Sequence, residues 1–135
     1  MLLTISADME STGDYTGYAE MTTARDALAK LATEYWRLLK LSERALADAQ
    51  AEKTTSLSAQ LRYSMNRLHV ICAEGGLRLI SHDRENYEPN LPVTVANAEE
   101  AASLDDTVIE RTLEPTIIFE GQVVAMGKVL LRKRV

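Results

Sequence analysis

The sequence predicts an α+β fold in which a long helix and a second, bundle-forming helix precede a small C-terminal β-sandwich. Positions 18 to 74 contain neither glycine nor proline, and apolar residues recur there with the period of a helix. The pair Gly75-Gly76 then provides a stop, because glycine tolerates the left-handed conformation that closes a helix. Beyond residue 86, prolines and short β-branched runs are typical of strands.

The first segment, residues 1–20, is polar and carries Gly13 and Gly17 together with acidic residues and no lysine or arginine. Neither a helical nor a strand period continues through it. We therefore expect a flexible or loosely docked N-terminal arm.

A heptad seam predicts the long helix that follows. Trp36, Leu39 and Leu46 widen the seam, and a wide stripe favours a helical bundle over a bare two-stranded coiled coil. The seam alternates spacings of four and three residues through Ala24, Leu28, Leu31, Tyr35, Leu38, Ser42, Ala45 and Ala49.

A second amphipathic helix is predicted after the polar run at 53–56, where Thr55 or Ser56 can cap the first turn. Its apolar positions are Leu57, Leu61, Met65, Leu68 and Cys72. A long thin helix needs apolar cover that a small β-domain cannot supply. We therefore expect residues 21–84 to be a helical segment that forms a homodimer. The expected dimer contacts are Leu28, Leu31, Tyr35, Leu38, Leu61, Met65 and Leu68.

Residues 85–135 are predicted to form the small β-domain. Val93–Val95 reads as a short strand, and Thr107–Leu113 alternates with β-branched residues. The runs 117–119 and 122–124 flank a turn at Glu120-Gly121, and the run 129–131 closes the set. Four or five short strands in about fifty residues suit a small sandwich.

Composition and charge exclude several classes of protein. At 135 residues with a net charge of −5, the chain lacks the basic stripe that nucleic-acid binding needs. No stretch approaches the roughly 20 apolar residues of a membrane helix, and the N-terminus has no basic segment of the kind that begins a signal peptide. Cys72, the sole cysteine, reads as a small buried hydrophobe. We expect a soluble, cytoplasmic protein with no membrane or nucleic-acid partner.

The sequence also predicts no enzymatic activity, no cofactor and no metal. The stretch Gly121 to Val129 has five residues between its glycines where a phosphate-binding loop has four, and Val129 stands where Ser or Thr would hold magnesium. His69 and His82 have no cluster of further ligands near them in the sequence, so we expect both on helix surfaces.

Five short motifs lie in a fixed order: Leu41-Ser-Glu-Arg-Ala-Leu46, Gly76-Leu-Arg-Leu-Ile80, Tyr87-Glu-Pro-Asn-Leu91, Thr107-Val-Ile-Glu110 and Glu120-Gly121. Together they resemble the GrpE family, the nucleotide exchange factors of DnaK-type chaperones. The first is similar to the end of the family's long helix, and the second to the end of its bundle helix. The others are similar to the Pro-Asn step into the β-domain, a Val-rich strand and an Asn-Gly turn.

The chain departs from the family pattern at several positions. Pro92 stands where the family usually has a histidine, Gln122 replaces an arginine just after the turn, and Ala125-Met126 replaces an arginine-containing pair. The long N-terminal stalk is almost absent. The loss of the arginine removes a charge-assisted hydrogen bond worth about 1.5–3 kcal/mol.

The resemblance implies a mechanical function. In the family, helices of two subunits form a bundle, and one β-domain pushes against the ATPase domain of a DnaK-type chaperone, which favours an open nucleotide cleft and ADP release. The partner contacts that it implies are Tyr87, Pro89, Leu113, Gln122 and Leu131.

Two other functions stay open at this point. One is a GrpE-like adaptor that binds a partner protein without nucleotide exchange, and the other is a structural protein whose oligomerising helices are its function. Stimulated ADP release separates exchange from the adaptor, and a chaperone pull-down separates both from the structural protein.

Overall fold

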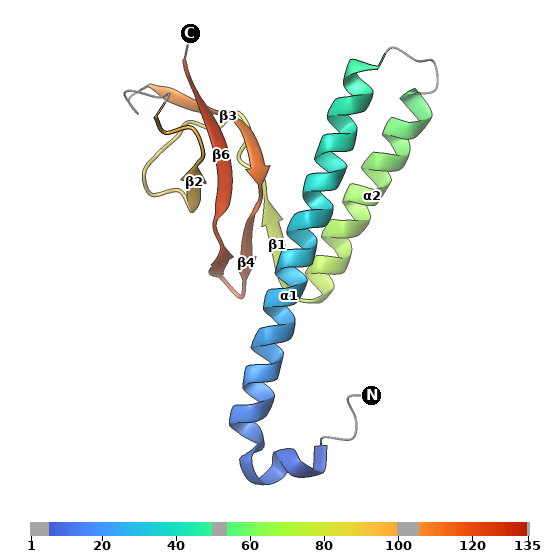
Figure 1. The fold of residues 1–135 in the computed structure, drawn as a ribbon, viewed down its shortest axis with the longest axis vertical. Helices are drawn as coiled ribbons and strands as arrows, with labels where there is room; N and C mark the ends of the chain where they lie inside the picture. The colour runs from blue at the N-terminus through green and yellow to red at the C-terminus, as the bar shows by residue number, and fades with distance from the viewer. Residues whose placement is uncertain (1–5, 50–53, 100–105, 135) are drawn as a thin grey trace.

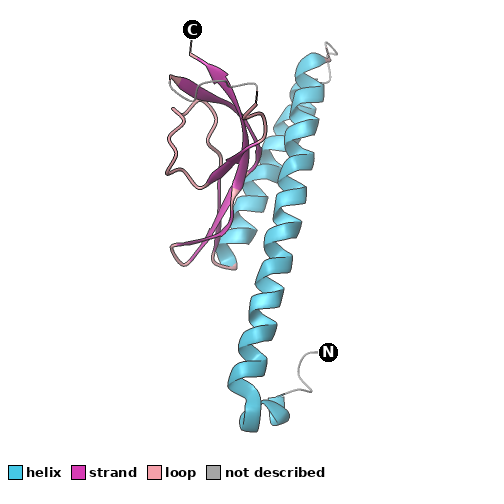
Figure 2. Ribbon diagram, turned by 60° about the vertical axis from the view of Figure 1, so that its left-hand side comes forward, coloured by secondary structure: helices cyan, strands magenta, loops and turns pink. Residues whose placement is uncertain are grey.

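The computed structural model describes residues 6–49, 54–99 and 106–134, and it is an α+β structure with two helices followed by two small sheets (Figure 1). Helix α1 spans Ser6–Asp48 and helix α2 spans Thr54–Glu74. The two helices lie side by side as a hairpin, and the β-region lies beside them (Figures 1 and 2).

The first helix begins earlier than its sequence pattern predicts. Residues 6–20, which we expected to belong to a loosely docked arm, are the first turns of α1, and residues 1–5 lie outside the described part of the chain. These residues have no sustained helical period of apolar side chains, so the sequence did not predict their helical conformation.

The predicted stop at Gly75-Gly76 is confirmed. The amide of Gly75 donates to the carbonyl of Cys72 at 3.0 Å, and Gly76 takes a φ of 83°, a conformation that favours glycine. A Cβ on Gly76 would also lie 3.0 Å from the Phe119 ring. The chain turns here directly into a strand, so residues 77–80, expected at the end of the helical segment, belong to the β-region.

The strands form two three-stranded sheets in the described residues. One sheet has the order β1-β4-β5, with antiparallel neighbours, and the other has the order β2-β6-β3, in which β2 runs parallel to β6. A tight turn at Glu120-Gly121, with both residues at positive φ, joins β4 to β5 as the sequence predicts. The strand bounds are β1 Leu77–Ile80, β2 Val93–Val95, β3 Thr107–Glu114, β4 Thr116–Phe119, β5 Gln122–Ala125 and β6 Gly127–Lys133.

Two apolar clusters hold these elements together. The larger cluster joins both helices to the first sheet, with Trp36 and Ile117 among its fully buried side chains. The smaller cluster lies within the second sheet and consists of Val93, Ile109, Val129 and Leu131. The first sheet is therefore fixed on the helices, whereas the second has a small core of its own.

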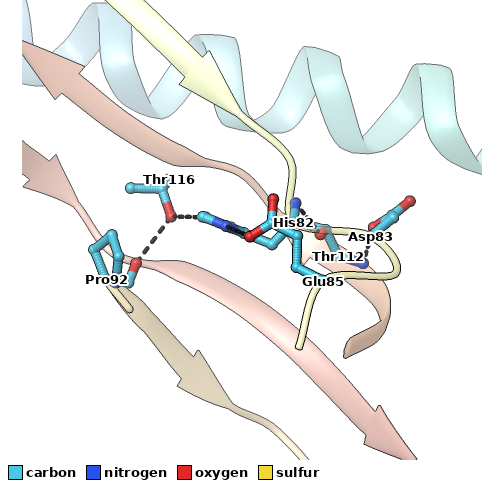
Figure 3. Close-up of polar contacts among 6 residues, drawn as sticks. All are labelled: His82, Asp83, Glu85, Pro92, Thr112 and Thr116. Atoms are coloured by element: carbon cyan, nitrogen blue, oxygen red, sulfur yellow. Dashed lines mark hydrogen bonds and ion pairs between the residues drawn. The ribbon is translucent and has the colours of Figure 1, made fainter. Parts of the chain in front are cut away.

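A buried polar cluster joins the two sheets (Figure 3). The hydroxyl of Thr116 on β4 donates to the carbonyl of Pro92, just before β2, at 2.8 Å, and Nε2 of His82 lies 2.9 Å from the same hydroxyl. Because the single hydroxyl hydrogen goes to the carbonyl, Nε2 of His82 must carry a hydrogen and donate it. His82 is 4% exposed, so the expectation of a helix-surface histidine is wrong. It lies in the loop after β1, where non-local partners satisfy it.

Candidate functional site

The most prominent surface feature is an exposed apolar face on α1. Leu31, Leu38 and Tyr35 are 66%, 62% and 41% exposed, and Ala24 and Ala45 on the same heptad positions are exposed as well. These are members of the predicted seam. The helix packs inside the chain through a different face, made of Ala29, Ala32, Trp36 and Leu39.

The exposed face extends across the hairpin to α2. A shallow depression of about 350 Å³ lies between the helices and is lined by Ser42, Ala45, Leu46, Leu57, Gln60 and Leu61. Leu57 and, further along α2, Ile71 are exposed apolar side chains. We call the set Ala24, Leu31, Tyr35, Leu38, Ala45 and Leu57 the apolar face. Because single exposed leucines are ordinary but a heptad row of them is not, this face is the strongest candidate for an interface.

The seven predicted dimer contacts divide into two groups. Leu31, Tyr35 and Leu38 belong to the apolar face and are free for contact in the single chain. Leu28, Leu61 and Met65 are half-buried against the larger core cluster, and Leu68 is buried within it. The latter four stabilise the hairpin itself. Sequence spacing could not separate the groups, because both faces of an interior bundle helix are apolar.

Helix α2 also has three exposed side chains that the sequence did not place on a surface: Tyr63, Val70 and Ile71. The run of residues 70–73 reads as uniformly apolar, and only Cys72 in it is buried. On a helical wheel of α2, Ile71 lies about 100° from the buried Cys72. A helical wheel would therefore have placed Ile71 outside the buried stripe.

The five predicted partner contacts do not form one surface in the single chain. Tyr87 packs half-buried against the second sheet's core, and Pro89, two residues later, is exposed. Leu113 lines a groove between α1 and β3, whereas Gln122 is exposed on β5 near Phe119 and Arg25. Leu131 is 3% exposed and belongs to the core cluster, so it packs the β-region and offers nothing to a partner.

The other candidate chemistry has structural explanations. A Cβ on Gly127 would lie 2.6 Å from the Thr116 hydroxyl, so this glycine permits close packing of β6 against β4 and leaves no room for a phosphate. Burial raises the pKa of the Cys72 thiol, which makes it a poor nucleophile. Within residues 6–49, 54–99 and 106–134, no group of three or more His, Cys, Asp or Glu side chains could hold a metal ion.

Neither α1 nor α2 has, in its described residues, the long apolar window that crossing a membrane requires. Comparisons with protein-family models, with curated proteins and with solved structures find no match to this chain. The apolar face, the β-region and the motif resemblance are therefore the features that point to a function.

Proposed function

We propose that the chain is a GrpE-like co-chaperone: a homodimer that binds the ATPase domain of a DnaK-type chaperone and promotes ADP release by favouring an open nucleotide cleft. The observation that carries the proposal is the apolar face on a hairpin that also holds a two-sheet β-region. Within the proposal, the two sheets act as the sandwich-like β-domain that the resemblance implies.

Pairing of two copies is supported by the free energy of burial. Leu31 and Leu38 stay largely in water in the single chain, and burying a leucine side chain contributes about 1.5–3 kcal/mol. A second copy supplies a matching face at the same heptad positions, as a two-fold interface requires. Two hairpins then form a four-helix bundle that carries two β-regions.

The β-region contacts the chaperone, in this proposal, through the loop that begins at Tyr87. The Tyr87 amide donates to the carbonyl of Thr107 at 3.1 Å, and its ring packs on the second sheet's core, so the start of the loop is anchored. Pro89 is exposed beside this anchor and is free for contact. Gln122, also exposed, is the second contact and lies on the first sheet.

Exchange follows by thermodynamic linkage. A protein that binds the open, nucleotide-free ATPase domain more tightly than the ADP-bound domain must weaken ADP by the same factor. Coupling of this kind is typically about 5- to 150-fold. An adaptor that kept the binding surface but lacked exchange activity would show no such difference.

Calorimetric titration of the host's DnaK-type ATPase domain, with and without saturating ADP, tests this function. We expect the affinity to fall by about 5-fold or more when ADP is bound. Pro89→Asp should weaken binding to the nucleotide-free domain, whereas Thr94→Asp, at an exposed position on β2, is the matched control. Equal affinity in both nucleotide states would favour the adaptor, and absence of binding would favour the structural oligomer.

A further inference from the structure

A groove of about 620 Å³ lies between α1 and β3, separate from the apolar face. Its walls come from the helix, from the turn after β1 and from strands β3 and β6, and four of its lining side chains are acidic. The basic side chains that line it are Arg37, Lys40, Arg44, Arg84, Arg111 and Lys128. In a chain with a net charge of −5, this groove is a local excess of positive charge.

Three of the cations are already paired. Arg37 lies 3.0 Å from a carboxylate oxygen of Glu34, Lys40 lies 3.6 Å from Glu43, and Lys128 lies 3.8 Å from Glu114. These exposed or half-exposed pairs contribute little stability, about 0–1 kcal/mol each. They neutralise two of the four lining acids.

The other three cations, Arg44, Arg84 and Arg111, have no carboxylate partner among the residues that the structure describes. In addition, Nε of Arg111 is buried without a hydrogen-bond partner, which costs free energy. Three guanidinium groups from three different elements therefore meet one groove without the anion that each of them favours.

The two remaining acids of the lining, Asp83 and Glu110, offset only part of this charge. A carboxylate oxygen of Asp83 accepts the backbone amide of Thr112 at 2.6 Å and holds the turn to β3. Glu110 lies exposed at an irregularity in the pairing of β3 with β6, where the register shifts between Ile109 and Arg111. Three unpaired guanidinium groups therefore face two carboxylates, Asp83 and Glu110, which leaves an excess of positive charge in the groove.

We propose that this groove binds an acidic peptide segment of a partner protein. Guanidinium groups bind carboxylates through two parallel hydrogen bonds, so a segment with several Asp or Glu residues fits the three unpaired arginines. Leu41 and Leu113 in the same lining provide apolar contacts between the charges. A nucleic-acid backbone fits less well, because it offers no aliphatic side chains to pack against Leu41 and Leu113.

The proposal does not rest on the co-chaperone function. Its first test is fluorescence anisotropy of the wild-type chain with a fluorescein-labelled peptide that alternates glutamate and leucine, and with a matched peptide that has glutamine for each glutamate. We expect binding of the glutamate peptide alone, with an affinity that falls as salt is raised. Equal binding of both peptides, or binding of neither, would overturn the proposal.

A pair of variants locates the site. Arg44→Gln with Arg84→Asn removes two unpaired cations, and asparagine tolerates the positive φ of 68° at position 84. We expect the dissociation constant of the glutamate peptide to rise about tenfold. The control Arg62→Gln with Arg78→Gln removes the same charge at exposed positions outside the groove and should change it less than about twofold.

Circular dichroism shows whether each variant is folded before it is compared. An equal loss in the control pair would mean that net charge, rather than the groove, determines binding, and the proposal would fail. Tighter binding of a thymidine oligonucleotide than of the glutamate peptide by the wild-type chain would likewise overturn it.

Discussion

At His82, hydrogen bonds from both sheets meet at one buried residue. Its backbone amide donates to the Thr112 hydroxyl on β3 at 2.9 Å, and its ring reaches Thr116 on β4 (Figure 3). Nδ1 of the ring lies 3.3 Å from a carboxylate oxygen of Glu85. Because Pro92 accepts both from Thr116 and from the amide of Gly127, the cluster fixes the path of the chain into β2.

Thr116→Val tests this cluster. Valine has nearly the same shape, but it leaves Nε2–H of His82 without an acceptor and removes one donor to the Pro92 carbonyl. We expect the free energy of unfolding to fall by about 1–3 kcal/mol, the cost of an unsatisfied buried polar group, as measured by urea denaturation. Thr94→Val, at an exposed position on β2, should change it by no more than about 0.5 kcal/mol. Equal effects of the two substitutions would mean that the cluster contributes nothing specific.

At the scale of elements, the helix α1 presents two apolar faces with different roles. One face, with Trp36 and Leu39 at its centre, packs on α2 and the first sheet. The other carries Leu31 and Leu38 and is uncovered in the single chain. An uncovered heptad row of this length is what the homodimer proposal explains.

Leu31→Glu with Leu38→Glu should convert the proposed dimer to a folded monomer. Each substitution would place a charge inside the paired apolar faces, which costs several kcal/mol unless the copies separate. Sedimentation velocity measures the mass, and circular dichroism the helix content, which should be retained because the inner face is unchanged. Ala47→Glu with Thr94→Glu adds the same charge at exposed positions and should stay dimeric. A wild-type monomer at micromolar concentration would contradict the prediction.

Local features of the fold could be predicted from the sequence, and the burial of individual residues could not. Helix and strand signals are local, so the stop at Gly75-Gly76, the turn at Glu120-Gly121 and most strands could be predicted. The division of apolar residues between inner and outer faces could not be, because Leu68 and Leu38 have the same local pattern. Only the position of the partner element, α2 or the first sheet, decides which of them is buried.

The candidate site was harder to predict than the fold for the same reason. Leu131 on β6 was expected to contact a partner because the family resemblance implied it, yet it packs in the second sheet's core. The groove with Arg44, Arg84 and Arg111 gave no signal in the sequence, since its arginines come from segments far apart in the chain. Tertiary structure brings such residues together, and a count of charges along the sequence does not show which of them meet.

At the scale of the whole molecule, the larger core links the hairpin to the first sheet, and the hydrogen bonds of Thr116 with His82 and Pro92 link the first sheet to the chain that enters the second. A contact made by the β-region is therefore connected to the helices through both. In the proposed dimer, the bundle gives a rigid base from which a β-region can press on a partner. A lever of this kind needs a fixed support, and the core cluster that contains Leu77, Ile117 and Trp36 provides one.

Stopped-flow release of a fluorescent ADP analogue from the host's DnaK-type ATPase domain tests the proposed exchange function most directly. We predict that the wild-type chain accelerates release in a saturable manner. The Leu31→Glu, Leu38→Glu variant should require a higher concentration, because it lacks the paired base. An unchanged release rate at saturating protein, in the presence of a demonstrated complex, would contradict nucleotide exchange and favour the adaptor in its place.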